Sequence, residues 1–190
     1  MRNKNEIRKE ALDKRDNLSA IDKKIKDELI KERLFSNKFY DTADTILTYV
    51  SYKSEVSTLD IIEESLYLRK SVYCPKVLDL KNGYMEFYKI KDIKDLVMNK
   101  MGIYEPEEKH DTIFNDFENE NTLIIMPGTA FNYKKDRIGY NGGFYDRYLE
   151  RGNKLKSIAL CYECQIMKED FPISVFDKRP DYLLTENGII

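Results

Sequence analysis

The sequence lacks the features that would tie it to a membrane or to an oxidising compartment. It contains no run of about 18 apolar residues, so we expect no segment to cross a membrane as a helix. Its three cysteines, Cys74, Cys161 and Cys164, are few and odd in number, which argues against a framework of disulfides. Residues 1–15 contain no apolar signal core. We therefore expect a cytoplasmic protein.

An excess of positive charge is missing as well. The chain has 32 basic and 34 acidic residues and a formal net charge of −2, so no global positive field favours nucleic acid. No internal repeat or flexible linker divides the 190 residues. A chain of this length can bury a core without disulfides or metal, and we expect one domain, residues 1–190.

Several signatures of catalysis and nucleotide binding are also absent. The patterns G-x-x-x-x-G-K-[ST] and G-x-G-x-x-G do not occur, which excludes a P-loop and a dinucleotide fingerprint. The single histidine, His110, lies in a polar stretch, where we expect a surface position. Cys161 and Cys164 have the C-x-x-C spacing, but they follow a predicted strand instead of opening a helix, so we expect no redox pair.

One stretch, residues 126–151, combines features that suit a phosphate ligand. It follows an apolar, β-branched run at 122–126, which predicts a buried strand that ends at Pro127-Gly128. The next residues are basic and then rich in glycine: Lys134, Lys135, Arg137, Gly139, Gly142 and Gly143. A helix is predicted from about Phe144.

Each part of this stretch has a chemical use. Glycines let the backbone approach a ligand closely, and a glycine-rich turn before a helix leaves N–H groups free for phosphate oxygens. Arg137 could hold a phosphate through two hydrogen bonds, and Asp146 in the first helical turn could bind Mg²⁺ that bridges the phosphates. A second interpretation stays open, because such loops are common and a first-turn aspartate often only complements the helix dipole.

The segments MPGTAF and RIGYNGGFYDRYL resemble the signature of the 5-formyltetrahydrofolate cyclo-ligase family, which reads roughly [VM]-P-G-x-[AG]-F-[DN] and then R-[LI]-G-x-G-x-G-[YF]-Y-D. Weaker matches extend along the chain from Lys4 to Glu186. Asn141 departs from the pattern, because the family usually has a glycine there. Asparagine tolerates a left-handed backbone better than most residues, so the loop conformation can be kept.

The resemblance implies an enzyme that uses ATP and Mg²⁺ to convert 5-formyltetrahydrofolate into 5,10-methenyltetrahydrofolate, ADP and phosphate. Its partners would be these small molecules, without nucleic acid or membrane, and we expect a monomer. It implies catalytic roles for Arg137 and Tyr145, and a magnesium site at Asp146 and Asp177. ATP-binding residues carried over from the family are Lys4, Arg8, Arg137, Gly139, Tyr140, Asn141, Gly142, Gly143, Phe144 and Tyr145. Folate-binding residues carried over are Val50, Glu55, Tyr140, Asn141, Gly142, Gly143 and Phe144.

Other features near these positions have simpler interpretations from the residues alone. Lys4 and Arg8 lie one helical turn apart, and spacing by itself predicts two surface residues. Lys76 follows a predicted strand, where a phosphate ligand and a plain surface lysine are equally good interpretations. Asp181 is expected to brace the last strand. Residues 101–106 resemble a family segment near the substrate cleft.

The hydrophobic pattern predicts an α/β fold with a mostly parallel central sheet and helices on both faces. Helices are expected at 3–16 and from 19 to about 35, the second with Ile21, Ile25, Leu29 and Ile30 facing inward. Strands are expected at 45–50, 71–74, 122–126, 156–161 and 182–186. Asn82-Gly83 predicts a β-hairpin insertion over residues 77–90. The family resemblance implies the same three-layer, Rossmann-like architecture.

Two other classes of function stay open. A sugar-phosphate isomerase or acyl-CoA transferase on a similar fold would also bind phosphate, but it would need an acid–base or covalent carboxylate and no Mg·ATP. A nucleotide- or folate-binding module without catalysis is the other alternative, because Asn141 alters the glycine-rich loop. Turnover of 5-formyltetrahydrofolate that depends on ATP separates the three.

Overall fold

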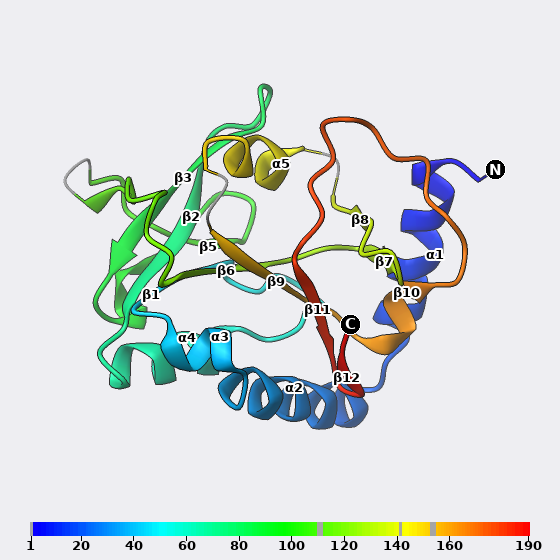
Figure 1. Cartoon of the computed structure of the whole chain (residues 1–190), viewed down its shortest axis with the longest axis horizontal. Helices are drawn as coiled ribbons and strands as arrows, with labels where there is room; N and C mark the ends of the chain where they lie inside the picture. Colours follow the sequence, from blue (N-terminus) through cyan, green and yellow to red (C-terminus); the bar gives the residue numbers. More distant parts are fainter. Residues whose placement is uncertain (1, 110–111, 141, 153–154) are drawn as a thin grey trace.

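The computed structural model describes residues 2–109, 112–140, 142–152 and 155–190. Within them a seven-stranded sheet lies at the centre, in the strand order β12-β11-β9-β6-β1-β2-β3 (Figure 1). Its strands are β1 (Thr45–Thr48), β2 (Ser71–Asp79), β3 (Tyr84–Ile90), β6 (Thr122–Met126), β9 (Lys156–Leu160), β11 (Tyr182–Thr185) and β12 (Gly188–Ile189). The inner pairs are parallel, and the edge strands β3 and β12 pair antiparallel. The predicted mostly parallel sheet is confirmed.

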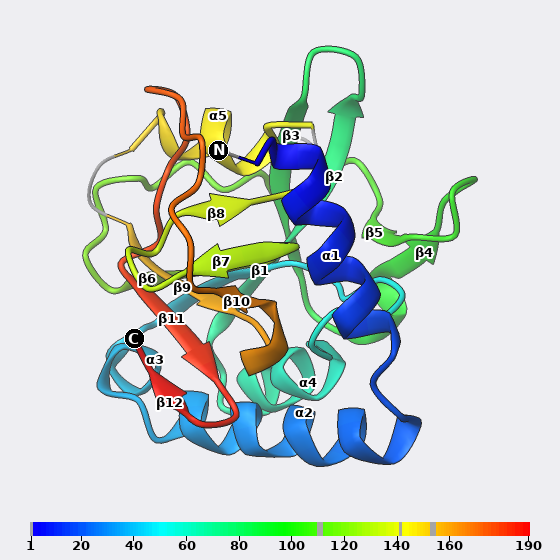
Figure 2. The same ribbon diagram turned by 90° about the vertical axis from the view of Figure 1, so that its right-hand side faces the viewer.

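The helices surround this sheet. They are α1 (Lys4–Asp16), α2 (Ala20–Phe35), α3 (Lys38–Thr42), α4 (Leu59–Tyr67) and α5 (Phe144–Leu149), with the 3₁₀ helices η1 (Ile93–Asp95) and η3 (Glu163–Gln165). Two smaller sheets consist of β10 (Ile166–Met167), β7 (Ala130–Asn132) and β8 (Arg137–Ile138), and of β4 (Leu96–Met98) and β5 (Tyr104–Pro106). Figure 2 shows α1 alongside the first of these. No described helix is both long and apolar enough to cross a membrane.

Alternation along β2 and β3 shows that α4 and α5 cover opposite faces of the sheet. Ile62 of α4 packs in one cluster with Cys74, which pairs with Tyr88 across the two strands. Phe87 precedes Tyr88 and therefore points to the other face. There its ring meets the ring of Tyr145 in α5, with the ring centroids 6.2 Å apart. The three-layer α/β prediction is confirmed.

The central strands were predictable because they are buried on both faces. All four residues of β1 and all five of β6 are buried. Parallel strands covered on both faces consist of near-continuous apolar residues, and β6, TLIIM, is of that kind. Leu47 of β1 pairs with Ile124 of β6, and both side chains have no exposed surface.

Helix α1 begins with a capping box. The side chain of Asn3 accepts hydrogen bonds from the backbone of Asn5 and Glu6, and the Glu6 carboxylate accepts one from the Asn3 N–H at 3.0 Å. Three residues at intervals of four, Ile7, Ala11 and Arg15, are buried. The inward face of α1 thus ends on an arginine, which the sequence pattern did not predict.

The inward face predicted for α2 is partly wrong. Ile21 and Ile25 are 74% and 55% exposed, and Leu29 is at the surface as well, whereas Ile30 and Leu34 have no exposed surface. A separation of nine residues is two and a half helical turns, so Ile21 and Ile25 lie opposite Ile30 and Leu34. One helix cannot pack both of these faces against the sheet, and the face with Ile30 and Leu34 is the buried one.

Strand β2 is longer than predicted. It continues through Pro75 to Asp79, because β1 pairs only with Ser71 to Tyr73, whereas β3 pairs with β2 from Val72 to Asp79. Proline is tolerated where the strand no longer needs its N–H for a second neighbour. The hairpin predicted near residues 77–90 is present and has Gly83 in its turn at φ 65°, in the region that favours glycine.

Candidate active site

A cavity of about 580 Å³ opens at the carboxyl ends of the central parallel strands. β1 and β6 are neighbours, and the residues just beyond them, Tyr49, Val50, Pro127 and Gly128, line it. Open α/β sheets bind their ligands at this edge. The volume lies within the roughly 300–1,000 Å³ typical of ligand pockets.

The cavity brings together residues that the sequence placed in distant segments. Every described residue of the predicted site lines it: Lys4, Arg8, Val50, Glu55, Arg137, Gly139, Tyr140, Gly142, Gly143, Phe144, Tyr145, Asp146 and Asp177. Asn141 lies outside the described residues. The residues from 101 to 106 that resembled a cleft segment contribute Met101, Ile103, Tyr104 and Glu105. The ligand contacts assigned to these residues remain predictions.

The glycine-rich turn has glycines for steric reasons. Gly143 is the N-cap of α5 with φ 64°, a left-handed conformation that side chains rarely adopt. A Cβ atom at Gly142 would lie 2.1 Å from the ring of Phe144. The turn therefore keeps the backbone bare at the cavity wall, where a phosphate could approach its N–H groups.

Helix α1 contributes two cations to one side of the cavity. The Lys4 ammonium forms an ion pair with Asp177, and both side chains are partly exposed. The Nε of Arg8 donates to the carbonyl oxygen of Gly139 at 2.8 Å, which ties the helix to the glycine-rich loop. Partial burial lowers the pKa of Arg8 from its usual value.

Arg137 and Asp146 form a second ion pair deeper in the cavity. Nη2 of Arg137 donates to Oδ1 of Asp146 at 2.7 Å, and the arginine side chain is only 5% exposed. The same oxygen accepts a hydrogen bond from the N–H of Lys178 at 3.0 Å. Because Lys178 follows Asp177, this bond places the two predicted metal ligands on adjoining parts of the cavity wall.

The two carboxylates fit a metal that is held partly by a nucleotide. Mg²⁺ usually takes one or two protein carboxylates and completes its coordination with water and phosphate oxygens. Within the described ranges no group of three or more His, Cys, Asp or Glu could hold a metal by itself. Asp146 and Asp177 both line the cavity, and each forms an ion pair with a basic side chain, Arg137 and Lys4 respectively. The donor set therefore fits Mg²⁺ that arrives with phosphates.

Glu55 is a buried acid that also lines the cavity. Its side chain is 7% exposed in total, and its Oε2 accepts a hydrogen bond from the N–H of Tyr52 at 2.8 Å. Burial raises the pKa of Glu55 to about 7, against the opposing charges of Arg15 and Lys23. A carboxyl group with this pKa can accept hydrogen bonds from a ligand near neutral pH.

Two polar atoms in the cavity wall have no partner among the described residues. They are the hydroxyl of Tyr145 and the Nε of Arg137, both buried. Burial also raises the pKa of Tyr145 well above its usual value, so the hydroxyl keeps its proton. Buried polar groups normally have partners, and a bound ligand would supply them here.

Several other expectations can be compared with the structure. Lys76 lies within β2, and its ammonium donates to the Glu105 carboxylate at 2.8 Å and to the carbonyl oxygen of Pro106. The ammonium therefore already has hydrogen-bond partners within the protein. Asp181 braces the last strand as predicted, accepting hydrogen bonds from the N–H and hydroxyl of Ser157. His110 lies outside the described residues.

The cysteines at 161 and 164 have the properties expected of inert thiols. Both are free, Cys161 is buried, and burial raises the pKa of each thiol above its usual value. A redox cysteine needs the opposite shift, toward the thiolate. The geometry agrees with the prediction that they do not form a redox pair.

Sequence reasoning missed the apolar wall of the cavity. Its members come from the hairpin and from loops that carry no motif, and include Tyr52, Val77, Leu80 and Met85. Alternation in β3 marked Met85 as facing one side of the strand, but it could not show that this side borders a cavity. Arg15 was also missed, although it lies on the same face of α1 as Lys4 and Arg8.

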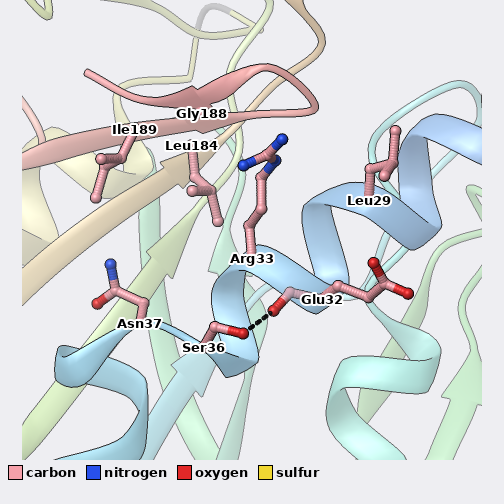
Figure 3. Close-up of a pocket in the computed structure, with 8 residues that line it drawn as sticks. All are labelled: Leu29, Glu32, Arg33, Ser36, Asn37, Leu184, Gly188 and Ile189. Carbon is pink, nitrogen blue, oxygen red and sulfur yellow. Dashed lines mark hydrogen bonds between the residues drawn. The ribbon is translucent and has the colours of Figure 1, made fainter.

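A second cavity, of about 450 Å³, lies between α2 and β12 and contains none of the predicted residues (Figure 3). Arg33 projects into it and donates through Nε to the carbonyl of Glu186 at 3.0 Å. Ser36 donates to the carbonyl of Glu32 at 2.9 Å. Among its described lining residues no ion pair is present, and Gly188 is the one glycine.

The fold and the first cavity define an α/β protein with a glycine-lined, charged site for a small molecule. The model of the 5-formyltetrahydrofolate cyclo-ligase family matches residues 1–186. The chain belongs to this family. The predicted family is therefore confirmed, and with it the prediction of an enzyme of the cyclo-ligase type.

Individual relatives agree with this assignment. The chain is 30% identical to the mitochondrial 5-formyltetrahydrofolate cyclo-ligase of Arabidopsis thaliana, over 93% of this chain and 72% of that protein. It is 27% identical to the enzyme of that name from Haemophilus influenzae, over 90% of this chain and 94% of that one.

Solved structures of similar fold carry the name 5,10-methenyltetrahydrofolate synthetase. The NMR structure from Aquifex aeolicus has a TM-score of 0.82 and 29% identity, covering 98% of this chain and 91% of that one. The structure from Mycoplasma pneumoniae has a TM-score of 0.75 at 24% identity and supports the fold.

Proposed function

We propose that this enzyme uses Mg·ATP to convert 5-formyltetrahydrofolate into 5,10-methenyltetrahydrofolate, with release of ADP and phosphate. Family membership supports the folate reaction. The observation that carries the proposal is the single cavity, because it collects every described residue to which the resemblance gives an ATP, folate or metal contact.

The reaction explains why ATP is needed. The N5-formyl group is an amide whose oxygen is a poor leaving group, and ring closure onto N10 must expel that oxygen. Transfer of the γ-phosphoryl group to the formyl oxygen turns the oxygen into part of a phosphate. N10 then attacks the formyl carbon, loses its proton, and phosphate leaves.

Positioning and charge neutralisation are the contributions of the protein. Lys4, Arg8 and Arg137 would neutralise phosphate charge from two sides of the cavity. Asp146 and Asp177 would hold Mg²⁺, which supplies further neutralisation of the phosphates when bound. The chemistry requires no nucleophilic side chain, in keeping with the absence of a nucleophile-and-base pair among the predicted residues.

Ligand binding would exchange the partners of both ion pairs. In the structure Lys4 holds Asp177 and Arg137 holds Asp146, each as a mutual pair. With Mg·ATP present, the cations would turn to phosphate oxygens and the carboxylates to the metal. The pairs thus keep these four charges in place and compensate each of them in the free enzyme.

The folate would occupy the end of the cavity near Glu55. This carboxylate and Val50 border the space that Tyr140 and Phe144 close from the glycine-rich loop. An aromatic ring there could stack on the flat pterin, while Glu55 accepts hydrogen bonds from its N–H groups. We further propose that the chain acts as one domain and as a cytoplasmic monomer.

The test is an absorbance assay for the methenyl product with purified protein, 5-formyltetrahydrofolate and Mg²⁺, with and without ATP. We expect product only in the presence of ATP. Binding of both ligands without product would support the non-catalytic binding module instead. Product that forms equally without ATP would exclude the proposed phosphoryl transfer.

A further inference from the structure

Arg15 is a buried cation next to the cavity that the proposed chemistry does not use. It lies in the last turn of α1, with 2% of its surface exposed. Its Nε donates to the hydroxyl of Ser54 at 2.9 Å, and its Nη2 donates to the hydroxyl of Tyr140. Its Nη1 is buried and has no hydrogen-bond partner among the described residues.

Stability alone gives little reason to bury this group. A buried charge is costly unless a counter-charge and hydrogen bonds compensate it. The carboxylate oxygen paired with Arg15 belongs to Asp16, lies 4.0 Å from Nε, and its side chain is 61% exposed. The strong contacts of the guanidinium are two neutral hydroxyls. An arginine in this position costs stability that a leucine or methionine would not.

The place of Arg15 on α1 connects it with the site. Lys4, Arg8, Ala11 and Arg15 follow one another at intervals of four, three and four residues, so they share one face of the helix. Lys4 and Arg8 line the cavity, and Ala11 is buried. Figure 2 shows this helix running along the molecule beside β7 and β10. The same helix face thus runs from the cations of the proposed phosphate end to Arg15.

The two partners of Arg15 come from the two loops that border the folate end. Ser54 directly precedes Glu55 in the loop after β1, and Tyr140 lies in the glycine-rich loop. Glu55 and Tyr140 both line the cavity. The Arg15 guanidinium carbon is also 5.6 Å from the centroid of the Tyr140 ring, within reach of a cation–π contact.

We propose that Arg15 is a positioning residue for the folate substrate: its buried guanidinium joins Ser54 to Tyr140 and so fixes the distance between Glu55 and the tyrosine ring. The proposal rests on the proposed function for its substrate. It differs from the assigned roles because Arg15 acts through two other residues and touches neither nucleotide nor metal.

The charge of Arg15 has a second consequence at Glu55. Arg15 and Lys23 are the cations that lower the pKa of this carboxyl group, against a larger rise from burial. The groups facing it also include the hydroxyls of Tyr49, Tyr140 and Tyr145, whose own pKa values its charge raises. Loss of Arg15 would therefore move the ionisation of Glu55 to higher pH.

Steady-state kinetics of Arg15→Ala, Arg15→Lys and Tyr140→Phe test the proposal, with Lys14→Ala as the matched control. Lys14 is the neighbouring cation on α1, and it is partly exposed and paired with Glu10. For Arg15→Ala we expect the KM for 5-formyltetrahydrofolate to rise roughly tenfold or more, as for loss of hydrogen bonds from a charged donor. The KM for ATP should rise less than the KM for 5-formyltetrahydrofolate, because Tyr140 is shared by both sites whereas Lys4, Arg8 and Arg137 are unchanged.

Four further readouts separate positioning from general stability. The KM effects of Arg15→Ala and Tyr140→Phe should be non-additive, because the two residues share one interaction. Arg15→Lys should restore part of the loss. The pH at which folate binding rises should move upward in Arg15→Ala. Hydrogen exchange at 51–56 and 138–140 should quicken in that variant, while β6 and β9 remain protected.

Opposite results overturn the proposal. A folate KM in Arg15→Ala equal to that of Lys14→Ala, or fully additive effects with Tyr140→Phe, would show that the arginine does not position the loops. If Arg15→Ala fails to fold, Arg15→Lys and Tyr140→Phe carry the same comparison. A wild-type protein without turnover would contradict the proposed function instead, and loop exchange would still decide whether Arg15 joins the loops.

Discussion

Glu55→Gln should stabilise the protein at high pH while weakening its use of folate. Burial raises the pKa of Glu55 from 4.5 to about 7 in the folded chain. Between these two values the unfolded chain has released a proton that the folded chain keeps. Stability therefore falls as the pH rises through this window, and the loss is complete above the folded pKa.

The magnitude follows from the size of the shift. Each pKa unit corresponds to about 1.4 kcal/mol, so a shift from 4.5 to about 7 costs the folded state about 3 kcal/mol at pH 8. Glutamine cannot ionise, and its carbonyl oxygen can keep the hydrogen bond from the Tyr52 N–H. The variant should match the wild type near pH 4.5 and exceed its unfolding free energy by about 3 kcal/mol at pH 8.

Urea denaturation of both proteins across this pH range measures the difference, with the exposed Glu63→Gln on α4 as the control exchange. The same samples should show a higher folate KM for Glu55→Gln, because the ionised acceptor is gone. A stability difference that does not change between pH 4.5 and 8 would refute the assignment of a raised pKa to Glu55. An unchanged folate KM would refute its place in the substrate site.

Three other expectations concern ATP, the metal and the thiols. Arg137→Ala should weaken ATP use by roughly ten- to a hundredfold, as for loss of a charged hydrogen-bond donor, and steady-state kinetics that show impaired folate use alone would contradict this. Asp146→Asn and Asp177→Asn should each raise the Mg²⁺ requirement with non-additive losses, whereas a double-mutant cycle with additive losses would separate their sites. Changing Cys161 and Cys164 to serine should leave turnover within a few-fold. Wild-type activity that follows the reductant concentration would argue for a redox role after all.

The sequence was most informative where local composition and tertiary burial agree. β1 and β6 consist of apolar and threonine residues that are all buried because both faces of the strands are covered, so the predicted strands are present. The glycine-rich loop was equally clear, since Gly142 and Gly143 satisfy local steric demands that no other residue meets as well. Features of this kind depend on neighbours in the chain and need no knowledge of the fold.

The errors arose where distant contacts decide the outcome. In α2 the apolar residues occupy two opposite rows, and only the position of the sheet determines that Ile30 and Leu34 are buried while Ile21 and Ile25 are exposed. β2 continues past Pro75 because β3 alone pairs with it there. Composition cannot specify which neighbour a strand lacks.

Arg15 illustrates the limit for the site itself. A charged residue in a charged helix indicates a solvated face, and its partners lie 39 and 125 positions further along the chain. The family pattern marked the residues that would touch ligands, but it gave no signal for a residue that acts through Ser54 and Tyr140. Such positions become visible only when burial and hydrogen bonds are known.

If ATP activates the formyl oxygen, that oxygen must leave with the phosphate. Substrate labelled with oxygen-18 in the formyl group would be converted with Mg·ATP, and the released phosphate would be analysed by mass spectrometry. We expect one labelled oxygen in the phosphate for each methenyl product, together with one ADP. Phosphate without the label, alongside normal product formation, would show that ATP is hydrolysed without phosphorylating the formyl group and would exclude the proposed activation.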